Sequence, residues 1–465
     1  MQLDRFVSEI GDIPHTTDRA RVRAKSQDMS GYFSPILKGD AEGKLADIVV
    51  TPRNKDDIFR IARAAFRARM PLLCRGAGTC NFGQGIPLAG GAIVDITQFD
   101  RILWIQDRKV RAEPGARLHI IDRETQKAAG GELRMHPSTR RSTLGGYIAG
   151  GHVGIGSCTW GILRDRGNIV AAEAVSVEEN PRIVELRGAD VNKVHHAYGT
   201  NGILTEIEMP LAPAYRWLEA IVSFRDFMDA TRFAIDLNQS DGVLVKLTSV
   251  YSWPYQKWLT PLARYFRDGE HTVHVMVADE FSEAFDWIAR DSGGVVVYRG
   301  LEGQGEFGVP LYEFSFGHAG LHARKVVPDL VGNLGLFPHN DLMGSVERVF
   351  AKFGPMGPFQ YDMKRIDGTL TLQGAPTFPY VDADHVRRFL EGMEAEGVRF
   401  ANIHTLHVRE NGMKPVDAEE IAFKRRMDPL NLMNPGKLTA DDLGEDDQGG
   451  GAALPTSGWR YRQAG

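Results

Sequence analysis

The sequence predicts an α+β fold in two domains, and three observations support this prediction. The chain has 465 residues, more than the roughly 250–300 residues at which a single core stops growing. Hydrophobic residues make up 43% of the chain and charged residues 25%, as in a globular protein with a substantial interior. Strand-like apolar runs alternate with amphipathic helical segments, so we expect sheets that are covered by helices.

A first domain is predicted over residues 45–213. It opens with the strand-like run DIVVTP, which is followed by a helix over residues 54–70. The apolar residues of that helix share one face; they are Ile58, Ile61, Ala62, Ala65 and Phe66. Further strand-like runs follow; they are LLC, GAIVDI, KVRAEPG, IVAAEAVSV, RIVELRG and GILTEIEMPL, with a helical LHIIDRETQKAAG after the third.

A second domain is predicted over residues 214–415, after two prolines in PLAPAYR interrupt the pattern. It contains two strand–helix–strand units, which favour a sheet with helices on one face. Residues 1–44 precede the first domain as an N-terminal extension. Residues 441–465 are acidic and then rich in glycine, so we expect a mobile tail. The sequence shows no long internal repeat.

Charge and composition argue against several classes of protein. A net charge of −5 and a pI near 6.3 lack the basic excess of a nucleic-acid-binding protein. The N-terminus has no secretory apolar core and no segment approaches 18 apolar residues, so a cytoplasmic protein is predicted. Cys74, Cys80 and Cys158 have no CxxC spacing, which predicts free thiols. No metal site is predicted.

A glycine-rich loop separates two apolar runs within residues 70–96. A dinucleotide fingerprint does not fit this loop, because Asn81 stands where the third glycine is required and no helix follows. A P-loop does not fit either, because no GK[ST] closes the segment. Two interpretations are left: an ordinary hairpin loop, or a concave run of backbone N–H groups that binds an anion.

A second glycine-rich stretch over residues 137–161 favours the binding interpretation. This stretch also carries hydroxyl groups, which belong to Ser138, Thr139, Ser142, Thr143 and Ser157. Two such loops in one domain suit a large ligand with two phosphates and an extended polyol.

Four motifs of the sequence are the two glycine-rich loops, AYGTNGILTEIEMPL and the closing DPLNLMNPGKL. As a set, they resemble the FAD-binding oxidoreductases of the vanillyl-alcohol oxidase and p-cresol methylhydroxylase (PCMH) superfamily. The resemblance covers residues 45–213 and 418–438. It implies a two-part PCMH-type FAD-binding domain with a ferredoxin-like α/β cap domain that binds the substrate. It also implies that residues 416–440 return the chain to the FAD domain.

The resemblance assigns FAD-binding residues to both loops. In the first loop, those that would hold the pyrophosphate are Arg75, Gly76, Ala77, Gly78, Thr79, Cys80 and Asn81. In the second loop, those that would line the ribityl chain and isoalloxazine are Pro137, Ser138, Thr143, Gly145, Gly146, Ala149, Gly151 and Ser157. Ile203 would lie near the adenine. Relatives with covalent flavin carry a histidine at the place of Thr79, so noncovalent FAD is predicted, with a covalent histidine from the cap left open.

The cap domain is expected to supply the catalytic base. His318, in the strand-like run YEFSFGHAGLHARKV, is the first candidate, and His404, in FANIHTLHV, is the second. For each of them the alternative is a structural histidine. Cys158 and Trp160 could approach the flavin ring, but simple packing is the favoured interpretation.

An aromatic segment over residues 251–268 allows two interpretations. Its large apolar residues share a helical face beside basic residues. The face could bind a membrane surface and pass electrons to a quinone, although packing within the cap or pocket is favoured.

The predicted activity is an oxidase or dehydrogenase that transfers a hydride from a small hydroxylated substrate to N5 of FAD. The substrate would be an alcohol, a polyol or sugar, a hydroxy acid or an aromatic alcohol. The chain lacks the GDGN-type signature of glycolate and D-lactate relatives, which favours an alcohol or polyol. One alternative is a transferase or lyase of the ether-lipid synthase type, and another is an electron-relay subunit. The sequence leaves open whether oxygen, a quinone or a protein accepts the electrons, and whether the chain forms a homo-oligomer.

Overall fold

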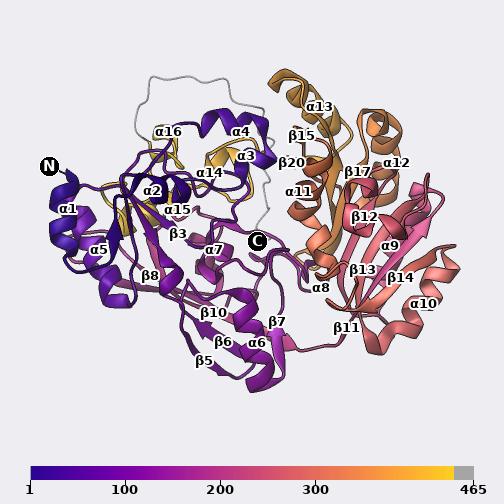
Figure 1. Ribbon diagram of the computed structural model, residues 1–465, viewed down its shortest axis with the longest axis horizontal. Helices are drawn as coiled ribbons and strands as arrows, with labels where there is room; N and C mark the ends of the chain where they lie inside the picture. Colours follow the sequence, from indigo (N-terminus) through magenta and orange to yellow (C-terminus); the bar gives the residue numbers. More distant parts are fainter. Residues whose placement is uncertain (1, 445–465) are drawn as a thin grey trace.

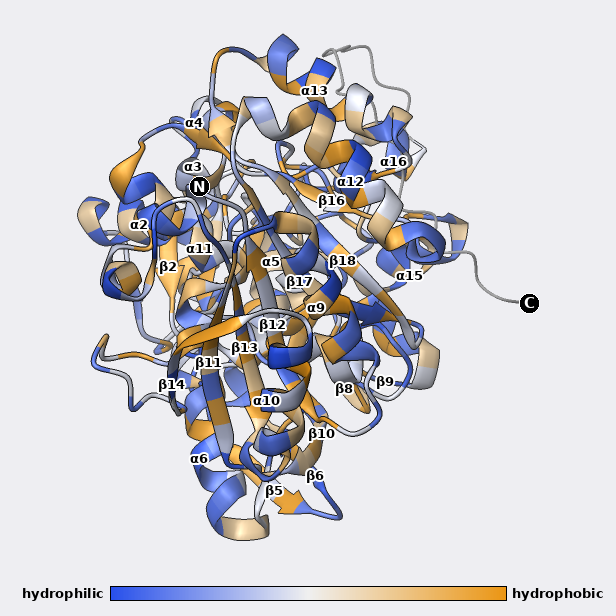
Figure 2. Cartoon of the chain, turned by 90° about the vertical axis from the view of Figure 1, so that its right-hand side faces the viewer, coloured by the Kyte–Doolittle hydropathy of each residue, from blue (hydrophilic) through white to orange (hydrophobic). Residues whose placement is uncertain are grey.

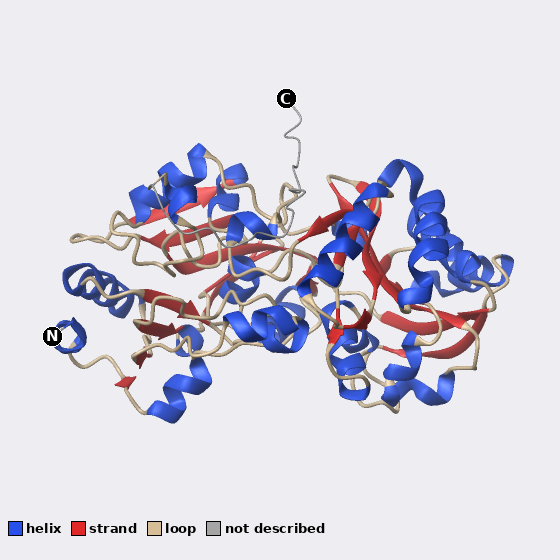
Figure 3. Cartoon of the chain, turned by 90° about the horizontal axis from the view of Figure 1, so that it is seen from above, coloured by secondary structure: helices blue, strands red, loops and turns tan. Residues whose placement is uncertain are grey.

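The computed structural model of the protein describes residues 2–444 and shows two lobes (Figure 1). The left-hand lobe in that view contains the N-terminal part of the chain and the yellow C-terminal segment, and the right-hand lobe contains the predicted cap. Figure 3 shows from above that both lobes combine sheets with helices.

The left-hand lobe contains a small, mostly parallel sheet with the strand order β1–β2–β4–β3. Its strands are β1 (His15–Thr16), β2 (Ile48–Val50), β3 (Leu72–Arg75) and β4 (Ala92–Asp95). Helix α5 (Lys55–Ala68) connects β2 to β3, and the Asn54 side chain caps it by accepting a hydrogen bond from the Asp57 N–H at 2.9 Å. Helix α1 (Gln2–Ile10) packs on α5 and buries Phe6 and Ile10 in the same core. Three short helices follow α1; they are α2 (Arg19–Lys25), α3 (Ser30–Phe33) and α4 (Pro35–Asp40).

A second sheet of the same lobe is antiparallel and has the order β5–β6–β10–β8–β9, with β7 paired to the end of β10. The strands are β5 (Ile102–Gln106), β6 (Lys109–Ala112), β7 (Gly131–Leu133), β8 (Ala171–Val175), β9 (Ile183–Arg187) and β10 (Ile203–Pro213). The helices between them are α6 (Leu118–Ala129), α7 (Leu144–Gly150) and α8 (Ser157–Trp160).

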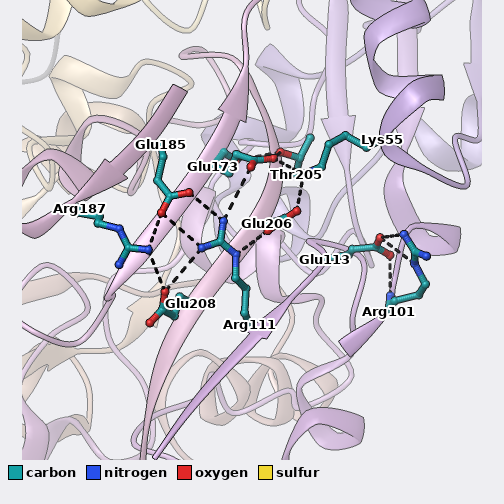
Figure 4. A network of polar contacts seen from close by, with 10 residues as sticks. All are labelled: Lys55, Arg101, Arg111, Glu113, Glu173, Glu185, Arg187, Thr205, Glu206 and Glu208. Atoms are coloured by element: carbon teal, nitrogen blue, oxygen red, sulfur yellow. Dashed lines mark hydrogen bonds and ion pairs between the residues drawn. The ribbon is translucent and has the colours of Figure 1, made fainter. Parts of the chain in front are cut away.

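A network of ion pairs covers one face of this second sheet (Figure 4). Arg111 on β6 pairs with Glu206 at 2.5 Å and with Glu185 at 3.0 Å. Lys55, at the start of α5, pairs with Glu173 at 2.6 Å and also with Glu206. Lys55 therefore ties the helix of the first sheet to the strands of the second.

The cap is built on an eight-stranded antiparallel sheet with the order β14–β11–β13–β12–β17–β18–β16–β20. The strands are β11 (Trp217–Phe224), β12 (Val245–Tyr251), β13 (His271–Ala278), β14 (Val295–Leu301), β16 (Leu334–Leu336), β17 (Phe359–Ile366), β18 (Thr369–Pro376) and β20 (Arg399–Ala401). The helices are α9 (Phe227–Gln239), α10 (Ser282–Asp291), α11 (Phe316–Val326), α12 (Leu342–Phe353) and α13 (Ala383–Ala395). Short strands β15 (Leu330–Val331) and β19 (Phe378–Pro379) pair separately.

The cap contains an internal repeat that the sequence did not reveal. Each half follows the chain order β-α-β-β-α-β, first through β11, α9, β12, β13, α10 and β14, then through β16, α12, β17, β18, α13 and β20. In both halves the fourth strand lies beside the first, and the third lies between the first and second. The halves join where β12 pairs with β17, as in Ser249 opposite Asp362. The two halves share a topology, and the same hydrophobic pattern can maintain a topology even where the residues of the two halves differ.

Helices α9, α10, α12 and α13 cover one face of the cap sheet. Figure 2 looks onto this side, where α9 and α10 lie in front of apolar strands. Phe227 and Phe233 of α9, Phe285 of α10 and Val275 of β13 meet in the core between the two layers. The opposite face of β17 and β18 is free to contribute to a cavity between the lobes.

The C-terminal segment packs on the first sheet. Helices α14 (Val408–Asn411), α15 (Ala418–Met427) and α16 (Ala440–Leu443) lie in this part of the chain. The Leu72 N–H donates to the Leu432 carbonyl at 2.7 Å, and the Asn434 N–H donates to the Leu72 carbonyl at 2.7 Å. These bonds place the segment along the free edge of β3. The predicted tail lies outside the described residues from residue 445 onward.

Several local predictions differ from the structure. The run expected as a strand around His318 is helix α11, since Ala, Leu, Arg and Lys within it favour a helix. The aromatic segment forms two 3₁₀ turns (Tyr255–Trp258 and Thr260–Tyr265) instead of one helix, with Pro261 at the start of the second. The second glycine stretch contains the short helix α7. Across residues 2–444, no helix has the length and apolar character needed to cross a membrane.

Candidate active site

A cavity of about 280 Å³ lies between the two lobes. Both glycine-rich loops and the segment around residues 196–204 line it from the left-hand lobe. Helix α11 and strands β17 and β18 line it from the cap, and Phe33 lines it from the N-terminal extension.

The first glycine loop connects β3 to β4 and contributes to the cavity every residue predicted for it, from Arg75 through Asn81. Gly78 has φ +72°, and a Cβ there would lie 1.9 Å from Nη2 of Arg75. A Cβ on Gly76 would lie 2.0 Å from Oγ1 of Thr143 in the second loop. Only glycine therefore fits at these two positions, and the bare backbone of the loop faces the cavity.

Thr143 of the second glycine loop caps α7, because its Oγ1 accepts a hydrogen bond from the Gly146 N–H at 3.3 Å. Predicted residues from this loop that line the cavity are Pro137, Ser138, Thr143, Gly145, Gly146, Ala149 and Gly151. Ser157 does not line it; its Oγ accepts a hydrogen bond from the Gly154 N–H at 3.0 Å. Ile203 does not line it either, because it is buried between the sheets. Its neighbours Gly202 and Leu204 face the cavity instead.

Three histidines that we did not single out in the sequence gather beside the second loop. The ring of His152 lies 5.7 Å from that of His196 and 6.3 Å from that of His195. Burial lowers the pKa of His196 to about 4 and holds the pKa values of the other two well below the usual range. His152 and His196 line the cavity as neutral rings. The only signals for these histidines in the sequence were an adjacent pair of histidines and a single histidine within a glycine-rich stretch.

Strands β17 and β18 present polar side chains to the cavity, including Gln360, Asp362 and Gln373. Oδ1 of Asp362 accepts from Ser249 Oγ at 2.5 Å and from the Phe316 N–H at 3.3 Å, and Oδ2 accepts from Gln360 Nε2 at 2.7 Å. Burial raises the pKa of Asp362 to about 6. Because the Phe316 N–H belongs to the first turn of α11, Asp362 holds the start of that helix against the sheet.

Arg324 on α11 is a partly buried cation in the cavity wall. Its Nε, Nη1 and Nη2 donate to the carbonyl oxygens of Leu330, Gly320 and Phe33 at 3.0, 3.1 and 2.8 Å. No carboxylate among residues 2–444 forms an ion pair with it. Burial accordingly lowers the pKa of Arg324 to about 10.

His318 lies near the start of the same helix and also lines the cavity. Its Nδ1 is 2.7 Å from Oε2 of Glu313. A carboxylate can only accept, so Nδ1 carries the hydrogen and the lone pair of Nε2 is left to accept a proton.

His404 does not line the cavity. Its Nδ1 lies 2.8 Å from Ser34 Oγ, and its Nε2 lies 3.3 Å from Oδ1 of Asn333, which does face the cavity. Burial lowers the pKa of His404 to about 4. His404 therefore lies behind Asn333, which separates it from the cavity.

The remaining aromatic and sulfur candidates pack in the interior. Cys158 is buried in the core of the cap, and its Sγ lies 3.2 Å from the Val245 carbonyl. Trp160 lies under Arg134, 4.8 Å from its guanidinium. Tyr255 of the aromatic segment is buried in a cluster under α11 and lines the cavity. This burial agrees with packing and a pocket, the favoured interpretation of that segment.

The cavity fits an FAD molecule by its chemistry. Two glycine-rich loops offer backbone N–H groups to phosphates. Within residues 2–444, the buried Nε of Arg75 and the buried hydroxyl of Tyr198 have no hydrogen-bond partner, and both residues line the cavity. Buried polar atoms of this kind require a partner that the ligand can provide.

Comparison with known proteins agrees with this fit, because residues 46–181 match the family model of the FAD binding domain. The chain carries a PCMH-type FAD binding domain, and FAD is its cofactor. The predicted resemblance and the predicted fold class are thereby confirmed.

Curated relatives of the protein are FAD-linked oxidoreductases. The glycolate oxidase subunit GlcD of Bacillus subtilis is 22% identical over 86% of this chain and 90% of that protein. A D-lactate dehydrogenase of Archaeoglobus fulgidus is 23% identical over 54% of this chain and 58% of that protein. Among solved structures, an alkyldihydroxyacetonephosphate synthase matches with a TM-score of 0.69 and 14% identity, over 93% of this chain and 85% of that one. These matches identify an FAD-dependent enzyme of an oxidoreductase family.

Proposed function

We propose that the protein oxidises a 2-hydroxy acid to the 2-oxo acid, with Arg324 binding the carboxylate and His318 accepting the hydroxyl proton. The observation that carries the proposal is Arg324, a partly buried arginine of the cavity wall that has no carboxylate partner among the described residues. A buried cation is expensive unless an anion compensates it. A substrate carboxylate would supply that anion.

The guanidinium of Arg324 is prepared for such a ligand. Three backbone carbonyls use three of its five N–H donors and fix its plane. One N–H on each of Nη1 and Nη2 is left without a partner in these bonds and could donate to a carboxylate. Carbonyl partners also leave the positive charge unneutralised.

The reaction divides between the two side chains of α11. His318 accepts the hydroxyl proton on Nε2, and Glu313 stabilises the resulting imidazolium through Nδ1–H. FAD held by the two loops would supply the hydride acceptor, so that the substrate would lose a hydride, which carries two electrons, from C2 and a proton from its hydroxyl oxygen. We propose that both glycine loops hold the FAD noncovalently, because Thr79 stands where covalent relatives place a histidine.

The relatives support an acid over the alcohol or polyol that the missing GDGN-type signature favoured. Glycolate and D-lactate, which appear in the names of two relatives, are both 2-hydroxy acids. In this proposal, Arg324 on α11 of the cap would supply an anion anchor without that signature.

Anaerobic mixing of the holoprotein with glycolate, lactate, ethanol or glucose tests the proposal. We expect the visible flavin band to bleach with a hydroxy acid and to persist with the uncharged compounds. Arg324→Gln should raise the acid concentration for half-maximal bleaching by roughly 10- to 100-fold. Arg299→Gln, a change at a cap arginine that pairs with Asp286 at 2.5 Å, is the matched control. Bleaching by ethanol or glucose alone would refute the acid, and flavin that no compound bleaches would favour a transferase without net redox.

A further inference from the structure

We propose that the N-terminal segment over residues 27–34 forms one wall of the substrate site, and that Phe33 limits the size of the acid that Arg324 binds. The inference rests on the proposed function, which makes Arg324 the carboxylate anchor. No sequence motif marks this segment, which we expected only to precede the FAD domain.

The segment is attached to the first glycine loop. Nη1 of Arg75 donates to the Gln27 carbonyl at 2.7 Å, and the Met29 N–H donates to the Cys80 carbonyl at 2.9 Å. The Gly85 N–H donates to Oδ2 of Asp28 at 3.2 Å. These bonds hold successive residues of the segment to the loop that faces the cofactor, so its position is coupled to that loop.

The end of the segment is attached to the cap. The Phe33 carbonyl accepts from Nη2 of Arg324 at 2.8 Å, and Ser34 Oγ lies 2.8 Å from Nδ1 of His404. The segment therefore bridges both lobes at the edge of the cavity. This bridge also explains the position of His404, whose ring contacts Ser34 from behind the cavity wall.

The Phe33 ring covers one face of the anchor. Its centroid lies 5.2 Å from the guanidinium carbon of Arg324, and the residue is 5% exposed. Helix α11 has glycines against the ring: a Cβ on Gly317 would lie 3.5 Å from it, and one on Gly320 would lie 3.7 Å from it. The ring therefore packs directly on the helix backbone.

This position gives Phe33 two effects on an acid in the cavity. The ring excludes water from one side of the guanidinium, which strengthens the bond to a carboxylate. It also occupies space beside the anchor, because Phe33 lines the cavity. A bulky group on the carbon next to the carboxylate would meet the ring, whereas a hydrogen or methyl group would not.

The test compares Phe33→Ala with the wild-type holoprotein by titration of two carboxylates that cannot be oxidised at C2, acetate and phenylacetate. Binding is followed by perturbation of the flavin absorbance. We expect Phe33→Ala to bind acetate about five- to tenfold more weakly, because the stacked ring is lost. Phenylacetate should bind more tightly, so the preference for phenylacetate over acetate should rise at least about tenfold. Phe33→Leu should give an intermediate ratio.

Tyr32→Ala is the matched control, because Tyr32 is the neighbouring aromatic residue and is 63% exposed. It should leave both affinities unchanged. This inference would be overturned if Phe33→Ala had the same preference for phenylacetate over acetate as the wild type, while Arg324→Gln still weakened acetate binding. The proposed function would then be left standing. The proposed function, and this inference with it, would be overturned if the wild-type protein bound neither acid. The same would follow if Arg324→Gln bound each acid as tightly as the wild type does. If Phe33→Ala does not retain FAD, the ratio measured in Phe33→Leu decides.

Discussion

At the scale of single residues, helix α11 places the proposed proton acceptor and the proposed anion anchor in one cavity wall. His318 is oriented by Glu313, and Arg324 is held by backbone carbonyls. Asp362 fixes the first turn of the helix through the Phe316 N–H. Both side chains therefore depend on one element whose position is set from the neighbouring sheet.

Replacing His318 by asparagine should slow flavin reduction by a 2-hydroxy acid by about 10²- to 10⁴-fold, because the proton acceptor is lost. FAD content and the affinity for acetate should stay near wild-type values, since Arg324 is untouched. Stopped-flow absorbance at saturating acid measures the rate. His339→Asn, a change at an exposed histidine of the cap, is the control. An unchanged reduction rate in His318→Asn would remove this residue from proton transfer.

At the scale of elements, the two glycine loops fit together as one unit. Thr79 Oγ1 and Ser142 Oγ lie 2.8 Å apart, and Gly76 leaves no room beside Thr143. The first loop is anchored by β3 and β4, and the second by α7. The cofactor site therefore depends on contact between loops that are some 60 residues apart, as the 63-residue separation of Thr79 and Ser142 shows.

Gly76→Ala should weaken FAD binding by at least about tenfold, because its Cβ would lie 2.0 Å from Thr143 Oγ1 and force the loops apart. Quenching of FAD fluorescence on titration into apoprotein measures the affinity. Gly39→Ala serves as the control, because a Cβ at Gly39 meets nothing within 4 Å. Equal affinities in the two variants would contradict the close fit of the loops.

Glu219 on β11 gives the cap a pH dependence. Burial is the main cause that raises its pKa from 4.5 to about 7, and its carboxylate accepts from the Leu311 N–H at 2.6 Å. The folded state therefore binds the proton more tightly than the unfolded state. This contribution to stability is complete below pH 4.5 and is lost as the pH rises through about 7.

Glu219→Gln should remove that dependence. Relative to wild type, the free energy of unfolding of the variant should rise by about 2 kcal/mol between pH 5 and pH 8. Urea unfolding at the two pH values, followed by the fluorescence of the cap tryptophans, measures this difference. Glu283→Gln changes an exposed position of α10 and is the control. Its free energy of unfolding should change with pH as that of the wild type does. A constant difference between Glu219→Gln and wild type would show that Glu219 does not titrate in this range.

At the scale of the whole molecule, the cavity exists only where the lobes meet. Lys246 of the cap pairs with Glu132 of the left-hand lobe at 3.3 Å, and Arg140 pairs with Glu302 at 3.4 Å. These ion pairs cross the interface beside the second glycine loop. The cytoplasmic location stays a prediction from the sequence.

Noncovalent FAD should leave the whole protein on acid denaturation. After precipitation with acid, we expect the yellow colour in the supernatant, because only folded loops hold the cofactor. The absorbance of supernatant and redissolved pellet measures the partition. A pellet that stays yellow after washing would contradict noncovalent binding and direct attention to the histidines of the cap and of the second loop.

Much of the cofactor side could be predicted from the sequence. Arg75 through Asn81, and most residues assigned in the second loop, do line the cavity. Ser157 and Ile203 do not, because each side chain is turned into packing that a motif does not specify. The substrate side was harder to predict, since the run around His318 was expected as a strand and forms α11.

From the sequence alone, the resemblance to a family of FAD-binding proteins determined the cofactor, because the glycine-rich motifs that carry this resemblance are local patterns. Only the tertiary structure decided which side chains share the cavity with FAD. Phe33, Arg324 and Asp362 come from distant parts of the chain, and long-range packing brings them together. The same packing leaves Arg324 without a carboxylate partner among residues 2–444, and the lack of a partner in space leaves no signal in a sequence.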